Sequence, residues 1–250
     1  MSVPSPPTLV ALLHGVPTGP ALWDGVHTRL RAAGVSAVAP ALAGTAPGDP
    51  PPPTLDAALD ALGTTLEAAA AGAPVLLVGQ DWGGLLAAGL AAEARLPVAG
   101  LVLTSVPLGW GWAPAVLGAR PPLDRLLYRR HAGRLYLRHG ASPAARPALA
   151  EAFAPRTHDP RMPATMQALA RLIPQAPLRR WRRALARASF PVRFVHGLGD
   201  PFVPALAPVA RALVWPAARA VLLPGARHYA PADQPAAYAR AVVEILRLTR

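Results

Sequence analysis

The chain has no cysteine and no lysine among its 250 residues. Without cysteine it can form no disulfide, no thiol nucleophile and no cysteine-ligated zinc site, and cysteine usage says nothing about its redox compartment. Without lysine it can form no Schiff base and cannot use a Walker-type phosphate loop that depends on lysine. These two absences exclude several large classes of mechanism.

We also expect neither a membrane-spanning nor a targeting segment. No apolar run is long enough to cross a bilayer, and the first residues lack the basic start of a signal peptide. The apolar content is 52%, which suffices for one domain, or for one core with an inserted lid. We therefore expect a soluble, cytoplasmic protein with no membrane contact.

Acidic residues are few, because 13 Asp and Glu stand against 25 Arg and give a net charge of +12. Residues 120–187 hold 15 of the Arg and only three acids, so the whole excess lies in this segment. A basic surface can attract nucleic acid, but no nucleic-acid motif accompanies the charge. We interpret the Arg side chains as solvating amphipathic helices, and we expect no nucleic-acid partner.

Short runs rich in Val and Leu alternate with longer helical patterns. The predicted strands are residues 9–13, 36–39, 75–78, 101–106, 192–195 and 220–223. The predicted helices are residues 21–33, 54–71, 83–95, 204–213 and 234–248. Continuous apolar strands separated by helices are typical of a parallel sheet covered on both faces, which indicates the α/β class.

One long interval between the fourth and fifth predicted strands breaks this alternation. It has a helical pattern interrupted by Pro and Gly, and it carries all of the excess charge. An insertion after a strand lies over the edge where open α/β sheets bind ligands. We predict a core of residues 1–108 and 189–250, and a helical, Arg-rich cap of residues 109–188.

The stretch VLLVGQDWGG at residues 75–84 runs from a strand pattern into a helix pattern and places Asp81 at the turn. The apex of such a strand-turn-helix elbow is exposed at the top of the sheet and needs small neighbours, which Gly79, Gly83 and Gly84 provide. The free N–H groups of the next helix stabilise negative charge at the apex. The pattern predicts that Asp81 is a reactive carboxylate.

Two further residues follow the last two predicted strands. Asp200 lies in VRFVHGLGDPFVP, and His228 lies in LLPGARHYAPADQP. Taken singly, an Asp before Pro is a turn former, a loop His is a surface residue, and an Asp at a helix start is an N-cap. Together, Asp81, Asp200 and His228 follow three strands in the order nucleophile, acid, histidine, which predicts a catalytic triad.

These motifs resemble the α/β-hydrolases, and within them the branch of epoxide hydrolases and haloalkane dehalogenases. LLHGVPTGPALWDGV is similar to the HGxP loop of that branch, and GQDWGG is similar to its elbow, in which Asp replaces the usual Ser. The resemblance covers the core on both sides of the insertion, whereas the cap fits only in size and position. It implies an α/β-hydrolase fold, with a mostly parallel sheet flanked by helices, and neither a cofactor nor a metal.

The resemblance also implies a mechanism. Asp81 attacks an sp3 carbon and forms an alkyl ester, and His228, oriented by Asp200, activates the water that hydrolyses it. The oxyanion donors are then the backbone N–H groups of Trp82 and Val16. His14 is expected to shape the HGxP loop, and Pro17 resembles the structural cis-proline of the branch.

The leaving group separates the two subfamilies, because an epoxide oxygen needs a proton donor whereas a halide needs only N–H donors. Tyr128 and Tyr136 are the cap tyrosines that could serve an epoxide, although both are equally compatible with packing. Many dehalogenases have Asn where this chain has Val16. The remaining candidate donors are indoles: Trp82, Trp110, Trp112 and Trp181.

We favour an epoxide hydrolase acting on a small apolar to moderately polar substrate, with haloalkane dehalogenase as the alternative. A serine esterase is discounted because no G-x-S-x-G motif occurs. A binding protein on a hydrolase scaffold would explain the basic cap but would leave the triad unexplained. The sequence leaves substrate size, stereochemistry and oligomeric state open.

Overall fold

The computed structural model of the chain describes residues 8–106, 108, 120–123 and 131–249. Six strands form one sheet in the order β2-β1-β3-β4-β5-β6, and all neighbouring strands are parallel. They are β1 (Leu9–Leu13), β2 (Ala37–Val38), β3 (Val75–Gln80), β4 (Val98–Thr104), β5 (Val192–Gly197) and β6 (Ala218–Leu223). Each predicted strand overlaps one of these, so the α/β class is confirmed.

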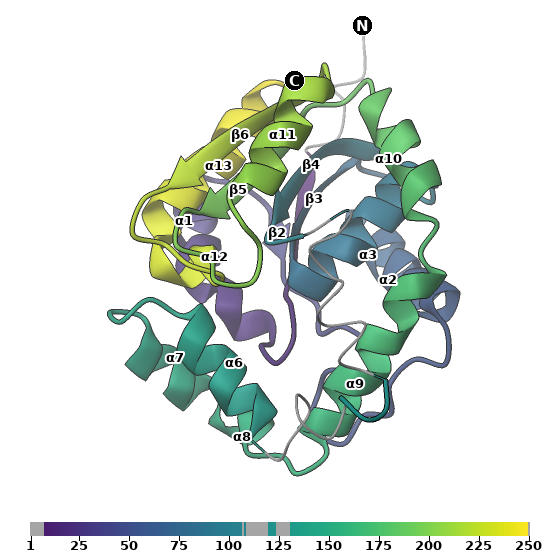
Figure 1. The fold of residues 1–250 in the computed structure, drawn as a ribbon. Coiled ribbons are helices and arrows are strands. Elements are labelled where there is room, and N and C mark those ends of the chain that lie inside the picture. Colours follow the sequence, from purple (N-terminus) through teal and green to yellow (C-terminus); the bar gives the residue numbers. More distant parts are fainter. Residues whose placement is uncertain (1–7, 107, 109–119, 124–130, 250) are drawn as a thin grey trace, which may run out of the picture.

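Helices cover both faces of the sheet (Figure 1). On one face, α1 packs against α13; on the other, α2 packs against α3, and α11 lies on β5 and β6. The bounds are α1 (Asp24–Ala32), α2 (Leu55–Ala70), α3 (Asp81–Ala92), α11 (Leu206–Val214) and α13 (Pro235–Arg247), with short η1 (Pro20–Trp23) before α1 and α12 (Ala230–Asp233) before α13. The helix predicted at 21–33 is therefore divided into η1 and α1.

Two hydrophobic cores lie on opposite faces of the sheet. Because alternate strand residues point to opposite faces, Val10 and Leu12 join the core beneath α1 and α13, whereas Ala11 and Leu13 join the core beneath α2 and α3. Every residue of β1 and β3 is buried. Burial on both faces explains why these strands are unbroken apolar runs in the sequence.

The interval between β4 and β5 is helical in its described residues and contains no strand there. Its elements are α6 (Ala132–Gly140), α7 (Arg146–Ala152), α8 (Ala154–Thr157), α9 (Met162–Leu172), η3 (Ile173–Gln175) and α10 (Leu178–Ala186). Helix α6 contacts α7, α8 and α9, and these four lie at one end of the molecule, whereas α10 packs along α3 (Figure 1). The helical character predicted for this interval is confirmed; that it forms a separate cap stays a prediction.

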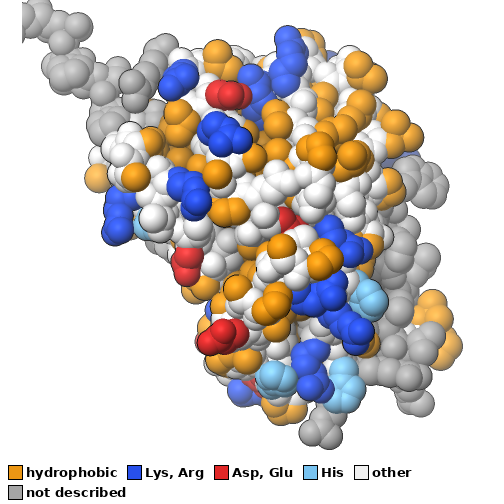
Figure 2. Space-filling view, turned by 90° about the vertical axis from the view of Figure 1, so that its left-hand side faces the viewer, with side chains coloured by type: hydrophobic (Ala, Val, Ile, Leu, Met, Phe, Trp, Pro, Cys, Tyr) orange, Lys and Arg blue, Asp and Glu red, His pale blue; other side chains and the backbone are white. Residues whose placement is uncertain are grey.

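The surface of α6, α7 and α8 is rich in Arg and His side chains (Figure 2). Figure 2 shows Arg and His side chains close together on the lower part of the face that it presents, where these helices lie.

Among the described helices, none combines the length and the hydropathy needed to cross a membrane.

Candidate active site

Asp81 lies where β3 ends and α3 begins. Its backbone has a φ of 53°, in the left-handed region that residues with a Cβ rarely adopt. The turn brings the carboxylate to the carboxyl edge of the sheet, with 12% of the side chain exposed. A sharp, strained turn between a strand and a helix is typical of a nucleophile elbow.

Glycines allow the segments around Asp81 to touch. A Cβ on Gly83 would lie 2.5 Å from the carbonyl oxygens of Leu13 and His14, and a Cβ on Gly79 would lie 2.5 Å from Gly84 Cα. The N–H of Gly83 donates to the His14 carbonyl oxygen at 3.1 Å. Glycine is therefore needed where the loop after β1 meets the elbow.

The loop after β1 supplies a hydrogen-bond donor to the carboxylate. The N–H of Val16 donates to Asp81 Oδ1 at 3.2 Å, and the Val16–Pro17 peptide bond is cis. Trp82 follows Asp81 directly, so its backbone N–H is one of the first in α3, where N–H groups lack intrahelical acceptors. The structure thus brings Val16 to Asp81, and the oxyanion role of Trp82 stays a prediction.

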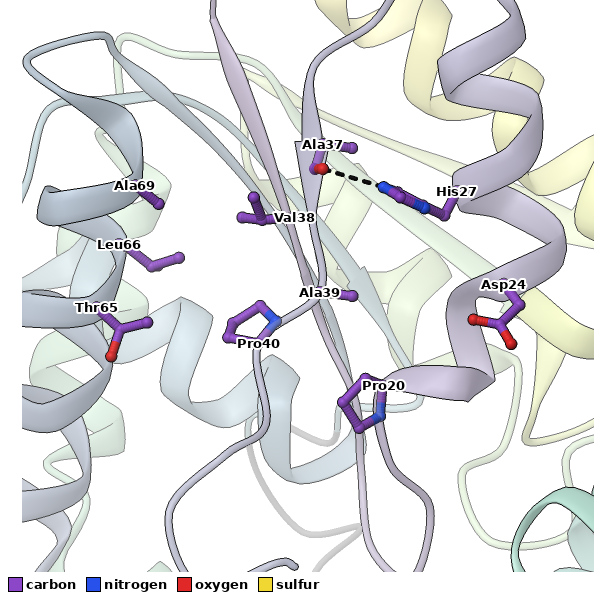
Figure 3. Close-up of a pocket in the computed structure, with 10 residues that line it drawn as sticks. All are labelled: Pro20, Asp24, His27, Ala37, Val38, Ala39, Pro40, Thr65, Leu66 and Ala69. Atoms are coloured by element: carbon purple, nitrogen blue, oxygen red, sulfur yellow. Dashed lines mark hydrogen bonds between the residues drawn. The ribbon is translucent and has the colours of Figure 1, made fainter.

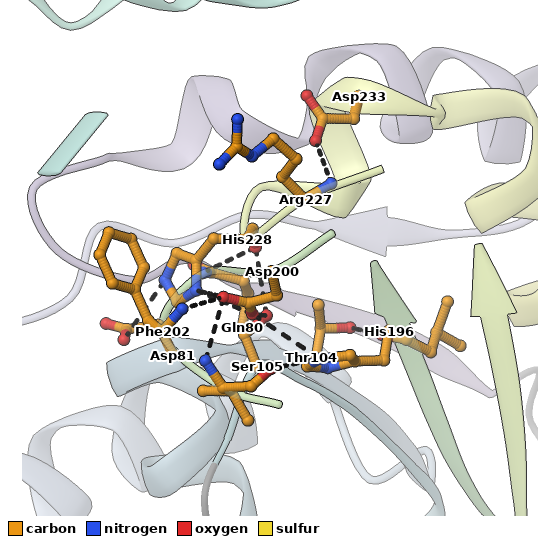
Figure 4. A network of polar contacts seen from close by, with 12 residues as sticks. Gln80, Asp81, Thr104, Ser105, His196, Asp200, Phe202, Arg227, His228 and Asp233 are labelled. Carbon is orange, nitrogen blue, oxygen red and sulfur yellow. Dashed lines mark hydrogen bonds and ion pairs between the residues drawn. The ribbon is translucent and has the colours of Figure 1, made fainter. Parts of the chain in front are cut away.

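His228 lies between the two predicted acids (Figure 4). Its Nδ1 is 3.1 Å from Asp200 Oδ2, and its Nε2 is 3.6 Å from Asp81 Oδ2. Burial alone would lower the pKa of His228, but the charge and hydrogen bond of Asp200, together with Asp81, outweigh burial and raise the pKa to about 10. The imidazole is therefore protonated at rest and faces both carboxylates.

Asp200 is held from several sides in the loop after β5. Its Oδ1 accepts the N–H groups of Phe202 at 2.8 Å and Val203 at 3.1 Å, and its Oδ2 accepts the Ser105 hydroxyl at 2.7 Å. Burial would raise the pKa of Asp200, but His228 and these donors hold it well below its ordinary value. Asp200 is therefore a charged carboxylate in a fixed orientation.

The structure also adds residues that were not predicted as part of the site. The amide Nε2 of Gln80 donates to the His228 carbonyl oxygen at 3.4 Å, and His196 Nε2 donates to the Val203 carbonyl oxygen at 2.9 Å. Ser105 directly follows β4, as Asp81 follows β3. The one feature of the sequence that could have indicated Ser105 is its position at the carboxyl end of a predicted central strand.

Aromatic rings enclose the imidazole of His228. Tyr136, from α6, stacks on Phe202 with ring centroids 4.1 Å apart, and each ring meets the imidazole edge-on, at 5.6 Å and 5.0 Å. Of the two tyrosines predicted for the cap, Tyr136 is therefore the one that the structure places beside His228. It comes from α6, one of the helices between β4 and β5.

Several buried polar atoms around Asp81 have no hydrogen-bond partner among the described residues. They are Gln80 Oε1, Trp82 Nε1, His228 Nε2 and Tyr229 Oη. Trp82 and Gln80 flank Asp81 in sequence, and Tyr229 follows His228. Unpaired buried polar groups are rare in folded proteins, and their concentration here indicates a place for a polar substrate or water.

Trp181 is not part of this site. Its indole N–H donates to Glu93 Oε1 at 2.8 Å, and its side chain is buried. Glu93 follows the last turn of α3, about 18 Å along the helix from Asp81 at 1.5 Å per residue. The prediction of Trp181 as a leaving-group donor is therefore wrong. Three other candidates lie outside the described residues: Tyr128, Trp110 and Trp112.

Comparison with known families agrees with this geometry. The model of the α/β-hydrolase family matches residues 10–241. The chain belongs to the α/β-hydrolase family. The match covers both parts of the predicted core and the inserted helices between them, so the predicted fold is confirmed.

Solved structures share the fold of this hydrolase. A thermophilic esterase from Thermogutta terrifontis has a TM-score of 0.79 and 22% identity over 98% of this chain and 91% of its own. A loop variant of a haloalkane dehalogenase from Bradyrhizobium elkanii has a TM-score of 0.75 and 23% identity over 98% and 90%. An enol-lactonase from Burkholderia xenovorans LB400 has a TM-score of 0.75 and 20% identity over 97% and 92%. A search of curated proteins found no match.

His14 of the hydrolase has a structural environment. Its Nδ1 donates to the Gly15 carbonyl oxygen at 2.8 Å, and its Nε2 accepts the N–H of Leu42 at 3.4 Å. Burial lowers the pKa of His14 to about 4, so the ring is neutral. Nδ1 thus binds within the HGxP loop, and Nε2 links this loop to the loop after β2.

A separate cavity of about 480 Å³ lies at the β2 edge of the hydrolase, between α1 and α2 (Figure 3). It contains no member of the triad. Its lining residues are Pro20, Asp24, His27, Ala37, Val38, Ala39, Pro40, Thr65, Leu66 and Ala69.

In the described part of the hydrolase, no three His, Asp or Glu side chains are grouped so as to hold a metal ion.

Proposed function

We propose that the protein is an epoxide hydrolase that converts an epoxide to a diol through an ester on Asp81. The observation that carries the proposal is the carboxylate at the strained elbow, in the place where Ser is usual in this fold. Val16 donates to one of its oxygens, and His228 Nε2 lies 3.6 Å from the other. This arrangement supports attack by Oδ2 while Oδ1 stays bound.

In the first step, Asp81 Oδ2 forms a bond to an epoxide carbon as the bond from that carbon to the ring oxygen breaks. The ring oxygen leaves with the electron pair and takes a proton from an acid. Tyr136 is our candidate for this acid, because its ring lies edge-on to His228 at 5.6 Å. Residues 109–188 act as the cap that brings Tyr136 to the reacting atoms.

In the second step, water attacks Cγ of the ester. Esterification removes the charge of Asp81, so the pKa of His228 falls and the imidazole can release its proton to solvent. Nε2 then takes a proton from the attacking water, and the oxyanion on Oδ1 is stabilised by the N–H groups of Val16 and Trp82. Collapse breaks the bond from Cγ to the diol oxygen, which takes the proton back from His228. The second proton of the water leaves the regenerated Asp81 carboxyl and, with the proton released earlier to solvent, restores Tyr136 and His228 to their starting states.

Haloalkane dehalogenase is a second candidate, supported by the unpaired indole N–H of Trp82. That atom is buried next to the nucleophile and could bind a departing halide as readily as an epoxide oxygen. A halide needs no proton, so Tyr136 would then have no chemical role. The two candidates share the ester on Asp81 and differ in the product, diol or free halide.

The test is to trap the ester. In His228→Gln, which lacks the base for the second step, styrene oxide or 1-bromohexane should add one alkyl group to the protein. Because the chain has no lysine, trypsin releases Asp81 in a single peptide of residues 32–95, in which fragmentation locates the adduct. Intact mass then gives the fraction that is alkylated.

Asp81→Asn in the same His228→Gln background is the matched control, because Asn keeps the shape of Asp and tolerates the left-handed backbone. It should remain unmodified. If folded His228→Gln gains no adduct from either reagent, the proposed mechanism is wrong. Wild-type assays for diol and for free halide then separate the two candidates.

A further inference from the structure

A second strained turn lies beside the nucleophile elbow. Gln80 and Thr104 are register partners at the ends of β3 and β4, and the next residues, Asp81 and Ser105, have φ angles of 53° and 55°. A left-handed backbone is unfavourable for a residue with a Cβ and persists where surrounding contacts hold it. The elbow explains this conformation for Asp81, and Ser105 requires an explanation of its own.

The side chain of Ser105 contacts both partners of the nucleophile. It is only 2% exposed, and its Oγ lies 2.7 Å from Asp200 Oδ2 and 3.2 Å from the His228 carbonyl oxygen. One hydroxyl proton serves one acceptor at a time, and the shorter contact is to the carboxylate. Gln80 also donates to the His228 carbonyl oxygen, so that oxygen has another partner while Ser105 donates to Asp200.

Ser105 binds the carboxylate oxygen that faces the histidine. Asp200 Oδ1 is held by two N–H groups of its own loop, from Phe202 and Val203, and lies 3.3 Å from His228 Nδ1. Oδ2 is nearer to that nitrogen, at 3.1 Å, and also accepts the Ser105 hydroxyl. The Ser105 hydroxyl is therefore the hydrogen bond that links Oδ2 to the end of β4. Without it, fewer hydrogen bonds restrain rotation about the Cβ–Cγ bond, which moves both carboxylate oxygens relative to His228.

Ser105 is not placed to act as a nucleophile itself. Its contact with His228 is to the backbone carbonyl oxygen, and its hydroxyl points to a carboxylate that already binds the imidazole. No described ring nitrogen is available to take its proton, because His196 Nε2 is bound to the Val203 carbonyl oxygen. The contacts indicate orientation and not attack.

We propose that Ser105 is a positioning residue that aims Asp200 at His228 and so sustains hydrolysis of the ester. The inference rests on the proposed function, because it assigns Ser105 to the second step of that mechanism. Alkylation of Asp81 does not use His228 as a base, so loss of the hydroxyl slows the second step and leaves the first unchanged. The signature is an ester that accumulates during turnover.

The experiment compares Ser105→Ala with Thr104→Val, a neighbouring buried hydroxyl that contacts the Val195 carbonyl oxygen and Tyr238 but no triad residue. Each variant and the wild type are mixed with styrene oxide, and samples are quenched at intervals. Mass spectrometry of the intact protein then gives the fraction that carries the ester. Ser105→Ala should slow ester breakdown about tenfold or more and leave the rate of alkylation within about twofold. Thr104→Val should resemble the wild type. Ser105→Gly also removes the hydroxyl while easing the left-handed backbone, so it replaces Ser105→Ala if that variant does not fold.

The outcomes distinguish this inference from the proposed function. Accumulation of ester in the Ser105 variants, and not in Thr104→Val, supports the positioning role. If His228→Gln accumulates the ester but the Ser105 variants turn over like the wild type, the role is wrong and the mechanism stands. Equal accumulation in Thr104→Val also overturns it, because any buried hydroxyl would then have the same effect. If His228→Gln forms no ester, both ideas fail.

Discussion

His228 Nε2 faces Asp81 Oδ2 across 3.6 Å, which is beyond normal hydrogen-bond distance. The two groups are thus close enough for their charges to interact strongly, but they do not form a hydrogen bond with each other. A water that attacks an ester on Asp81 has to lie within reach of this nitrogen. The charge of the nucleophile and the basicity of the histidine are therefore coupled.

Asp81→Asn should lower the pKa of His228. Asp81 is one of the groups that raise this pKa to about 10, and an opposite charge at this distance contributes about one to three units. The imidazole of the variant should therefore lose its proton at a lower pH than in the wild type. Titration of His228 by NMR measures the shift, and an unchanged or higher pKa would contradict the coupling.

His196 is the internal control for this titration. It is buried, and its pKa is lowered by burial while Asp200 and the Val203 carbonyl oxygen act against that effect. Asp81 is not among its perturbing groups, but His228 is, and the positive charge of His228 lowers the pKa of His196. Loss of that charge in Asp81→Asn can therefore only raise the pKa of His196 or leave it unchanged, so a pKa of His196 that falls together with that of His228 would indicate a rearranged site.

That Asp81, Asp200 and His228 lie close together could be predicted, because each follows a strand with a clear apolar pattern. Parallel strands end at the same edge of a sheet, so three polar residues placed after three strands had to come close together. The contact from Val16 to Asp81 was anticipated only through the HGxP resemblance. Ser105 was not anticipated, because Ser after a strand is common and its φ of 55° leaves no trace in the sequence.

The helical insertion was harder to interpret from sequence. In α10, Trp181 and Leu185 are one helical turn apart and form the buried stripe of an Arg-rich helix. Periodicity predicts such a stripe but does not say which neighbour it packs against. The stripe lies against α3, and Trp181 therefore binds Glu93 and does not reach Asp81.

Gly83→Ala should destabilise the protein by about 2 to 3 kcal/mol. Its Cβ would lie 2.5 Å from two backbone carbonyl oxygens of the β1 segment, which cannot move without displacing the loop that carries Val16. Activity should fall with stability. Denaturant unfolding measures the change.

Gly63→Ala is the matched control for Gly83→Ala. Gly63 is also buried, within α2, but among the described residues its Cβ would meet only Leu90 Cδ2, at 3.7 Å. Removing a helix-interior glycine without a clash should stabilise the protein by up to about 1 kcal/mol. If both variants lose stability equally, the close approach at the elbow is not the cause.

Trp181→Phe should lower the free energy of unfolding by about 1 to 2 kcal/mol and leave turnover unchanged. Phe keeps most of the buried ring but removes the N–H that donates to Glu93 at 2.8 Å. Glu93→Gln should destabilise the protein at least as much, because it also removes the charge that pairs with Arg95 and Arg180. The double variant should be less destabilised than the sum of the two. A clear fall in kcat for folded Trp181→Phe would contradict this and indicate that Trp181 takes part in the reaction.

Tyr136→Phe should separate the two candidate reactions. The substitution keeps the ring that stacks on Phe202 at 4.1 Å and removes only the hydroxyl. If that hydroxyl protonates the epoxide oxygen, alkylation of Asp81 by styrene oxide should slow about tenfold or more. Alkylation by 1-bromohexane should not change, because bromide leaves without a proton. The bromoalkane therefore serves as the control within the same protein, since a disturbed site would slow both reagents. Equal rates for wild type and Tyr136→Phe with styrene oxide would remove Tyr136 from the mechanism and with it the main support for an epoxide over a haloalkane.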